Sequence, residues 1–219
     1  LMCHLIFDFD GVLVDSVNIK TNAFCELFSE YNNSIVNQIK SYHLANGGIC
    51  RFEKIRYFYK NFIKEELDQD LFELKCSQFK RLVIKKVIAS NEICGAHKLI
   101  STKTKGYKFI VTGTPQEEIE EILIKKNWLG YFDEVLGSPI KKNIHVKYLL
   151  EKYKINSQKC LFFGDASTDY EAAKFNNVPF LGVCNKQSEL YIKHPKIDYI
   201  ENFSNFNLNS FKKEKNYVN

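Results

Sequence analysis

The sequence has few of the residues that mark disordered or fibrous proteins, and it has no long apolar run. Glycine occurs 10 times and proline 4 times among 219 residues, against 45% apolar and 26% charged residues, a composition that excludes a disordered chain and a fibrous repeat. No apolar run approaches the roughly 20 residues that a bilayer span requires, and no signal peptide precedes the first apolar segment. We therefore expect a soluble, cytoplasmic protein built as one domain, or as one core with a smaller companion.

Paired cysteines and a strong excess of one charge are also missing. The 7 cysteines are an odd number without any Cys-x-x-Cys pair, which argues against a disulfide framework and against a zinc site. The net charge is only +5, and the densest basic stretch, at Lys212, Lys213 and Lys215, is typical of a solvated tail. A nucleic-acid site would need a basic face on a domain. We expect no nucleic-acid or membrane partner, and a monomer or weak homodimer.

The sequence does contain short apolar runs separated by helical patterns. Runs of strand length occur at residues 5–7, 108–111, 133–136, 160–163, 179–183 and, more weakly, 198–200. Helical patterns follow Thr114, span residues 144–152 and begin again near Thr168; both threonines have capping-box spacing to a glutamate. Strands that alternate with helices of this length form a parallel sheet covered on both faces. The sequence therefore predicts an α/β fold with a Rossmann-like core.

One gap interrupts this alternation. About 97 residues separate Asp15 from Thr112, whereas a strand-helix-strand unit takes roughly 30. Apolar residues inside the gap recur at spacings of three and four in three sets, which predicts a small helical bundle. The sets are Phe24, Leu27, Phe28 and Tyr31; Phe52, Ile55, Tyr59 and Phe62; and Phe72, Cys76, Phe79, Val83 and Val87. We expect an inserted helical domain over residues 16–90 and a catalytic core made of residues 1–15 and 91–219.

A loop over residues 42–51 is expected between the first two helices of this insert. It contains a Gly-Gly pair, carries His43 and Arg51, and is followed one helical turn later by Lys54. Because glycine permits close approach of the backbone, the loop could reach a site on the core and present Arg51 and Lys54 to a substrate. The plain alternative for both side chains is a solvated helix face.

The candidate chemistry lies at the ends of two predicted strands. Asp8 and Asp10 follow the first apolar run, and Asp165 and Asp169 follow the run at 160–163. Carboxylates two residues apart at a strand end project toward the side where open parallel sheets bind ligands. Such carboxylates repel one another and lose hydration, so a cation is expected beside them. With no His or Cys cluster nearby, these oxygen ligands predict a Mg²⁺ site.

The segments around these carboxylates resemble the motifs of the haloacid dehalogenase superfamily, in its phosphoglycolate phosphatase and β-phosphoglucomutase-like branch. Residues 8–16 are similar to the first motif, Thr112 to the second, Lys142 or Lys141 to the third, and residues 164–169 to the fourth. The motifs occur in the family's order, each after a predicted strand, over essentially the whole chain. The helical insert matches the mobile cap of that branch.

The third motif leaves one choice open. Many relatives follow its lysine with proline, whereas Asn143 follows Lys142 in this sequence. The choice between Lys141 and Lys142 therefore depends on position alone. We prefer Lys142, because it adjoins the predicted start of a helix.

The resemblance implies that Asp8 attacks phosphorus to form an aspartyl phosphate. It implies that Asp10 protonates the leaving alcohol and then takes a proton from the attacking water. Asp10 argues against a dehalogenase, since those relatives lack an acid at this position and have no leaving alcohol to protonate. The expected enzyme is a Mg²⁺-dependent phosphatase for a small phosphorylated metabolite. A phosphosugar mutase shares the first half-reaction and stays open, and a catalytically silent binding protein is the more remote alternative.

The resemblance also assigns ligands. Mg²⁺ would be held by the carboxylates of Asp8 and Asp165 and by the backbone carbonyl of Asp10, with Asp169 nearby. The groups that would contact the phosphoryl oxygens are the Thr112 hydroxyl, the amides of Gly113 and Thr114, and the motif lysine.

Structural roles remain open for some of the same residues. Thr114 is favoured as a helix N-cap over a phosphate ligand, although the two roles can coexist. Asp15 could orient the hinge of the cap, and Asp169 could be a helix-start acid. Four histidines, His4, His97, His145 and His194, are expected at the surface or in loops.

Overall fold

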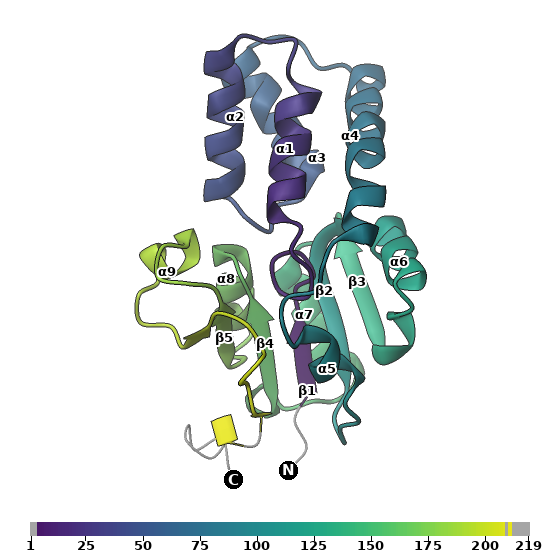
Figure 1. Cartoon of the computed structure of the whole chain (residues 1–219), viewed down its shortest axis with the longest axis vertical. Coiled ribbons are helices and arrows are strands. Elements are labelled where there is room, and N and C mark those ends of the chain that lie inside the picture. The colour runs from purple at the N-terminus through teal and green to yellow at the C-terminus, as the bar shows by residue number, and fades with distance from the viewer. Residues whose placement is uncertain (1–3, 209, 212–219) are drawn as a thin grey trace.

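The structure is a computed structural model in which residues 4–208, 210 and 211 are described. Its strands are β1 (His4–Phe7), β2 (Lys108–Pro115), β3 (Glu134–Ser138), β4 (Cys160–Gly164), β5 (Phe180–Val183) and β6 (Tyr199–Ile200). They form one six-stranded sheet in the order β3-β2-β1-β4-β5-β6, with all neighbouring pairs parallel (Figure 1). Every apolar run expected to be a strand is one, so the predicted parallel α/β fold is confirmed.

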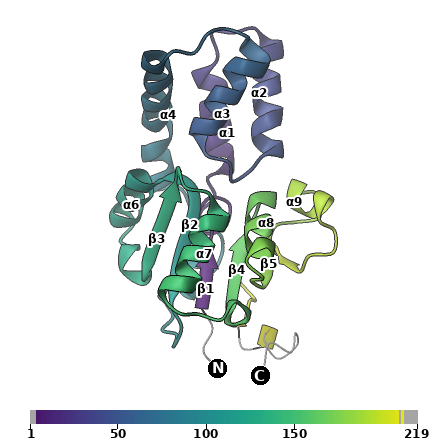
Figure 2. The same ribbon diagram turned by 180° about the vertical axis from the view of Figure 1, so that it is seen from behind.

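Helices cover both faces of this sheet. They are α5 (Ala96–Ser101), α6 (Gln116–Lys125), α7 (Lys142–Lys152), α8 (Ser167–Phe175) and α9 (Glu189–Lys193), with 3₁₀ turns at Leu129–Tyr131 and Ser157–Lys159. Side chains of the buried strand β1 alternate between two apolar cores, so that Leu5 and Phe7 pack with α5 and α6, whereas Ile6 packs with α7 and α8. In Figure 1 α5 lies in front of the sheet, and in Figure 2, which shows the molecule from behind, α7 and α8 lie in front. The site at the end of β1 therefore stands on a strand buried from both sides.

The long insertion after β1 is a helical cap that stands over the carboxyl ends of the strands (Figure 1). Its helices are α1 (Val17–Leu27), α2 (Asn33–Ala45), α3 (Arg51–Phe58) and α4 (Gln69–Ala89), with a π-helical turn at Tyr59–Ile63. The expected helical insertion is confirmed, but it has one more helix than predicted. Helix α2 was not predicted, although Ile35, Ile39 and Tyr42 recur at helical spacing and Asn32 caps the helix by accepting a hydrogen bond from the Ile35 amide. His43 therefore lies on a helix, and the linking loop shrinks to residues 46–50.

The cap joins the core through two chain segments that pair with each other. Val14 forms an antiparallel bridge with Glu92, the Asp15 amide donates to the Asn91 carbonyl at 3.0 Å, and the Ile93 amide donates to the Leu13 carbonyl at 3.0 Å. We propose these paired segments as the boundary between the two parts, next to the expected limits of residues 16–90. No helix in the described residues is both long enough and apolar enough to cross a membrane. The basic tail at residues 212–215 lies outside the described residues.

The helices expected after Thr114 and near Thr168 are present, but neither threonine caps its helix as predicted. Thr114 belongs to β2, and α6 begins at Gln116 after Pro115. Helix α8 begins at Ser167, where the Asp169 carboxylate accepts a hydrogen bond from the Ala166 amide at 3.1 Å. The hydroxyls of Thr114 and Thr168 have partners elsewhere, described below.

Two of the four histidines expected at the surface or in loops are buried. His4 lies on β1, where its Nδ1 accepts a hydrogen bond from the Tyr107 amide at 3.1 Å. His145 lies on α7 with its Nε2 2.8 Å from the Gly137 carbonyl oxygen. A neutral histidine can be buried where a backbone group satisfies its ring nitrogen, and a single sequence does not show that partner.

Candidate active site

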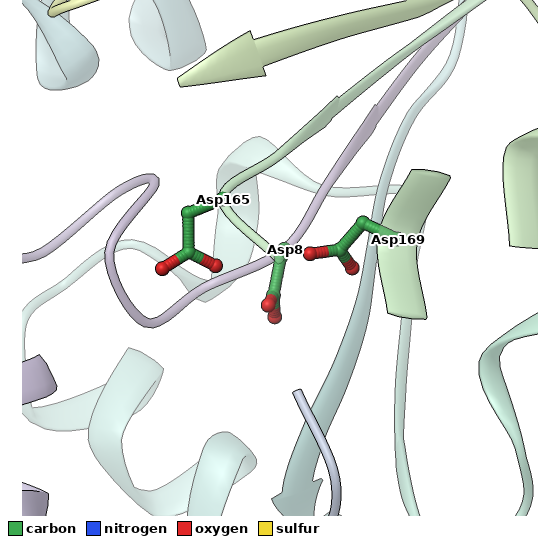
Figure 3. A group of neighbouring side chains, drawn as sticks. All are labelled: Asp8, Asp165 and Asp169. Atoms are coloured by element: carbon green, nitrogen blue, oxygen red, sulfur yellow. The ribbon is translucent and has the colours of Figure 1, made fainter. Parts of the chain in front are cut away.

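Three carboxylates meet where β1 and β4 end. Asp8 follows β1, Asp165 follows β4, and Asp169 lies in the first turn of α8 (Figure 3). One oxygen from each residue lies within 4.8 Å of the others. The two strands are neighbours in the sheet, and the Asp8 amide donates to the Phe163 carbonyl at 3.0 Å, so the backbone itself brings these strand ends together. The structure thus places three of the four predicted metal-site acids in one cluster.

The motif lysine that reaches this cluster is Lys142. Its Nζ lies 2.7 Å from Asp8 Oδ2 and 2.6 Å from Asp169 Oδ1, and its side chain is buried. Burial would lower the pKa of Lys142, but the charges of Asp169 and Asp8 outweigh burial and raise it. Lys141 is exposed at the start of α7. The position of Lys142 agrees with the preference stated above.

A single ammonium group does not neutralise the cluster. Burial and then the charges of Asp8 and Asp169 raise the pKa of Asp165 well above its ordinary value. Burial also raises the pKa of Asp169, to about 7, despite the contact with Lys142. Both shifts mean that the site is short of positive charge. A buried set of carboxylate oxygens fits Mg²⁺, which would supply the missing charge.

Gly11 allows this arrangement. Its φ of +73° lies in the left-handed region, and a Cβ at this position would collide with the Asp165 carboxylate. The glycine of the first motif therefore has a steric reason: it lets the turn after Asp10 pass close to the metal-site acid.

Asp10 lies apart from the cluster in a different environment. Its carboxylate accepts hydrogen bonds from the hydroxyls of Ser16 at 2.6 Å and Thr114 at 2.8 Å, and it contacts Lys20 Nζ at 2.5 Å. Burial would raise the pKa of Asp10, but the charge of Lys20 and these hydrogen bonds outweigh it and lower the pKa. Of the four predicted metal-site acids, Asp10 is thus the one whose carboxylate does not join the cluster.

Lys20 was not predicted from the sequence. It lies on α1, so a residue of the cap completes the surroundings of a core carboxylate. The available signal was its position one helical turn after Ser16 in the first motif. That signal is weak, because a lysine in the first turns of a surface helix is common.

A cavity of about 880 Å³ lies between the cap and the core and is lined by Asp8, Asp10 and Asp165. Thr112, Gly113 and Thr114 also line it, at the end of β2. Thr112 is buried, and its Oγ1 accepts a hydrogen bond from the Thr114 amide at 3.3 Å. The structure therefore brings the predicted phosphate ligands and the carboxylates to one cavity.

The loop of the cap at residues 46–50 closes over this cavity. A Cβ on Gly113 would collide with the Gly48 carbonyl oxygen, so the two backbones touch. The Thr168 hydroxyl donates to the Gly47 carbonyl at 3.2 Å, and Lys193 Nζ donates to the Ala45 carbonyl at 3.0 Å. These contacts bind the loop directly to the core, so the structure has the cap closed.

Arg51 and Lys54 are both buried and both line the cavity, so the alternative of a solvated helix face is wrong. Arg51 forms an ion pair with Glu118 of α6. Lys54 Nζ lies 2.9 Å from His43 Nδ1. Burial, followed by the charge of Lys20, lowers the pKa of Lys54 to about 7, and burial lowers that of His43 to about 2. The neutral His43 can therefore accept a hydrogen bond from Lys54.

Comparison with known proteins agrees with this arrangement. Residues 5–183 match the family described as Haloacid dehalogenase-like hydrolase. The phosphoglycolate phosphatase of Psychrobacter arcticus is 29% identical over 192 residues, which cover 82% of each chain. That of Colwellia psychrerythraea is 25% identical over 190 residues, covering 82% of this chain and 83% of the relative.

A solved structure supports the fold independently. The HAD-hydrolase YfnB of Bacillus subtilis, whose structure was determined bound to magnesium, superposes with a TM-score of 0.68 at 18% sequence identity. The match covers 98% of this chain and 99% of the other, so the core and the cap both correspond.

Proposed function

The chain belongs to the haloacid dehalogenase-like hydrolase family, and on that premise we propose a Mg²⁺-dependent phosphatase that hydrolyses a small phosphorylated metabolite through an aspartyl phosphate. The family and the enzyme class that the motifs predicted, a phosphatase of this family, are confirmed by the match and the relatives. One observation carries the finer proposal. Asp8 and Asp10 face the same cavity in opposite surroundings, one in a carboxylate cluster and the other among two hydroxyls and Lys20.

Asp8 is the proposed nucleophile. Its Oδ2 contacts Lys142, and its Oδ1 accepts a hydrogen bond from the Phe9 amide at 2.6 Å, so the carboxylate is held in one orientation. An Asp8 oxygen forms a bond to phosphorus while the bond from phosphorus to the ester oxygen breaks. A fixed nucleophile at the cavity wall avoids the entropy cost of bringing two reactants together.

Asp10 is the proposed acid and base. In the first step it gives a proton to the leaving oxygen; in the second it accepts one from the water that attacks the phosphoenzyme, releasing phosphate and free Asp8. Lys20, Ser16 and Thr114 stabilise the ionised carboxylate, which is the form that the second step requires. The negative charge of a bound phosphate ester raises the pKa of Asp10 and so favours the protonated form for the first step.

The remaining residues bind the phosphoryl group and the metal. Mg²⁺ would be held by Asp8, Asp165 and the Asp10 carbonyl, with Asp169 beside them, and would offset the charge of the phosphoryl oxygens. The Thr112 hydroxyl, the Gly113 and Thr114 amides and Lys142 are proposed to contact the same oxygens. Donors fixed before the reaction stabilise developing charge without having to reorganise.

The test is Mg²⁺-dependent hydrolysis of p-nitrophenyl phosphate by the purified full chain, followed by acid quenching. We expect many turnovers per enzyme, loss of activity in excess chelator and recovery with Mg²⁺. In an Asp10→Asn variant we expect a trapped phosphate that mass spectrometry assigns to Asp8. Full activity in chelator, or a covalent phosphate on another residue, would contradict the mechanism. Release of one p-nitrophenol per enzyme, with the phosphoryl group retained on Asp8 and very slow turnover afterwards, would favour the mutase instead.

A further inference from the structure

One side of the cavity is apolar and is formed where the cap meets α6. We call it the apolar lobe and define it by Val17, Phe24, Phe79, Val83, Val87 and Ile122, all of which line the cavity. Phe79, Val83 and Val87 recur at intervals of four on α4 and so share one helix face. The rings of Phe24 and Phe79 pack with their centroids 4.2 Å apart. A ligand that enters this lobe replaces water on aromatic and branched aliphatic surface.

The apolar lobe lies on the side of the site where the leaving group departs. Lys20 stands between Val17 and Phe24 on the cavity face of α1 and contacts Asp10, the proposed proton donor to the leaving oxygen. Thr114 also contacts Asp10 and leads directly into α6, which carries Ile122. In the sheet, β1 separates β2 from β4, so Asp165 lies toward the opposite side. The alcohol part of a phosphate ester held at Asp8 would therefore point into the apolar lobe.

The cations around the apolar lobe already have partners. Lys20 is paired with Asp10, and Arg51 is paired with Glu118, with both side chains of the latter pair more than nine-tenths buried. Lys54 contacts a neutral histidine and is only partly charged at neutral pH, since its pKa is lowered to about 7. The dianionic phosphoryl group is the anion with which Lys54 would pair, since Lys54 lies near Asp10 and Asp165. Lys193, the other lysine that lines the cavity, is paired with Glu189 at 2.6 Å, so among the described lining residues Lys54 is the one lysine or arginine that faces no carboxylate.

One polar atom at the lobe lacks a partner. Arg51 Nε is buried and has no hydrogen-bond partner within the described residues, although the guanidinium carbon lies 5.3 Å from the centroid of the Phe79 ring. A buried donor without an acceptor costs about 1–3 kcal/mol. An acceptor oxygen on a ligand would satisfy it. Because Glu118 already neutralises the guanidinium, a neutral acceptor suffices.

From these observations we infer the substrate class, an inference that rests on the proposed phosphatase function: a phosphate monoester of an uncharged alcohol that has an apolar face and a neutral acceptor group for Arg51. The ester that gives the two bacterial relatives their name, phosphoglycolate, carries a carboxylate next to its phosphate. Once Lys54 pairs with the phosphoryl group, every other lysine or arginine among the described lining residues already faces a carboxylate. The sequence led us to expect that Arg51 attracts an anionic substrate through its charge. In this inference its guanidinium, neutralised by Glu118, donates a hydrogen bond to a neutral acceptor of the substrate.

The experiment compares two esters of matched shape, benzyl phosphate and 4-carboxybenzyl phosphate, with the purified full chain and Mg²⁺. We expect kcat/KM to be at least about tenfold higher for benzyl phosphate, because the added carboxylate must be desolvated without a counter-charge. Equal or higher kcat/KM for the carboxylated ester would overturn the inference while leaving the phosphatase function intact. Absence of hydrolysis with both esters and with p-nitrophenyl phosphate would overturn the proposed function and, with it, the inference.

A variant tests the charge argument in the opposite direction. In Glu118→Gln the Arg51 charge is left without its partner, so we expect relative kcat/KM for 4-carboxybenzyl phosphate to rise by about tenfold. The matched control is Glu121→Gln on the same helix, where the glutamate is partly exposed and pairs with Lys80 at 3.5 Å; there the ratio of the two esters should not change. An unchanged ratio in folded Glu118→Gln would show that the ion pair does not set the selectivity.

A second variant tests the apolar face. Val83→Thr keeps the shape of the side chain and adds a hydroxyl to the lobe. We expect kcat/KM for benzyl phosphate to fall several-fold more than kcat/KM for ethyl phosphate, whose short alcohol part reaches little of the lobe. Equal losses for the two esters would contradict contact between the alcohol part and the lobe.

Discussion

Asp8 and Asp10 are two residues apart in the chain and lie in two different electrostatic environments. Asp8 is surrounded by groups of the core alone: Asp165, Asp169 and Lys142. Asp10 is held by Thr114 from the core, Ser16 next to the cap boundary and Lys20 from the cap. The first set is complete without the cap, whereas the second loses its cation when the cap moves away.

The difference separates two tasks within one site. The cluster at Asp8 requires a rigid scaffold, since β1 and β4 are buried on both faces and fix the carboxylates. The surroundings of Asp10 depend on cap position, so closure of the cap and stabilisation of the ionised Asp10 are one event. We propose that substrate access and proton transfer by Asp10 are thereby linked through Lys20. The following experiments test this contrast between a core half and a cap-dependent half.

The largest effect is expected from Asp8→Asn. The amide keeps the shape but cannot attack phosphorus, so kcat should fall by about 10⁴-fold or more. The fold should persist, which circular dichroism and thermal unfolding can verify. Measurable turnover near the wild-type rate would mean that Asp8 is not the nucleophile.

Lys142→Met should have the next largest effect. It removes the ammonium between Asp8 and Asp169, and we expect kcat to fall by about 10²- to 10³-fold. The metal-free variant should also have a lower Tm, because the buried carboxylates lose their partner. Lys141→Met is the matched control at the neighbouring exposed position, where kcat should change less than about twofold. Equal losses in the two variants would remove the distinction between the lysines.

Lys20→Met tests the cap-dependent half. Without the ammonium, Asp10 loses its strongest partner, and we expect kcat to fall by about 10- to 100-fold with little change in Tm. Lys20→Arg should recover part of this loss, because it restores the charge with a different shape. The measurement is steady-state kinetics with p-nitrophenyl phosphate. A rise in KM alone, with kcat intact, would show that Lys20 binds substrate and does not act through Asp10.

The smallest expected effect is in how far Mg²⁺ stabilises the folded protein at different pH values. The pKa of Asp165 is raised and that of Asp169 is raised to about 7, so the metal-free native state keeps protons that the unfolded chain releases near pH 4. These acids therefore destabilise the metal-free fold increasingly as pH rises from about 4 to 7. Mg²⁺ replaces the protons, so the increase in Tm on adding Mg²⁺ should be several degrees larger at pH 8 than at pH 5.5.

The comparison with and without Mg²⁺ serves as the control for this measurement. The lowered pKa of His43, about 2, makes stability depend on pH in the opposite sense, but it does so in both samples and cancels in the difference. Equal Mg²⁺-induced shifts at the two pH values would show that the carboxylates are already ionised in the metal-free protein.

Much of the core half could be predicted from the sequence, because short-range patterns specify it. Apolar runs that end in Asp8, Thr112 and Asp165 indicate buried parallel strands, and parallel strands bring their carboxyl ends to one edge. The order of the strands in the sheet was not predicted, and the choice between Lys141 and Lys142 depended on position alone; in the structure it is Lys142 that reaches the carboxylates. Helix α2 was missed although Ile35, Ile39 and Tyr42 recur at helical spacing.

The sequence by itself determined the sheet, the inserted cap and the set of acids at the strand ends, since these depend on periodicity and on residues close together in the chain. Only the tertiary structure decided which cations are free to bind an anionic group of a substrate. Arg51 meets Glu118 across 67 residues, so no local pattern shows that this cation is already paired. Burial and charge pairing depend on how the cavity is packed. Because of them, Arg51 is neutralised by Glu118 and Lys54 is only partly charged, although the sequence suggested both as ligands for an anion.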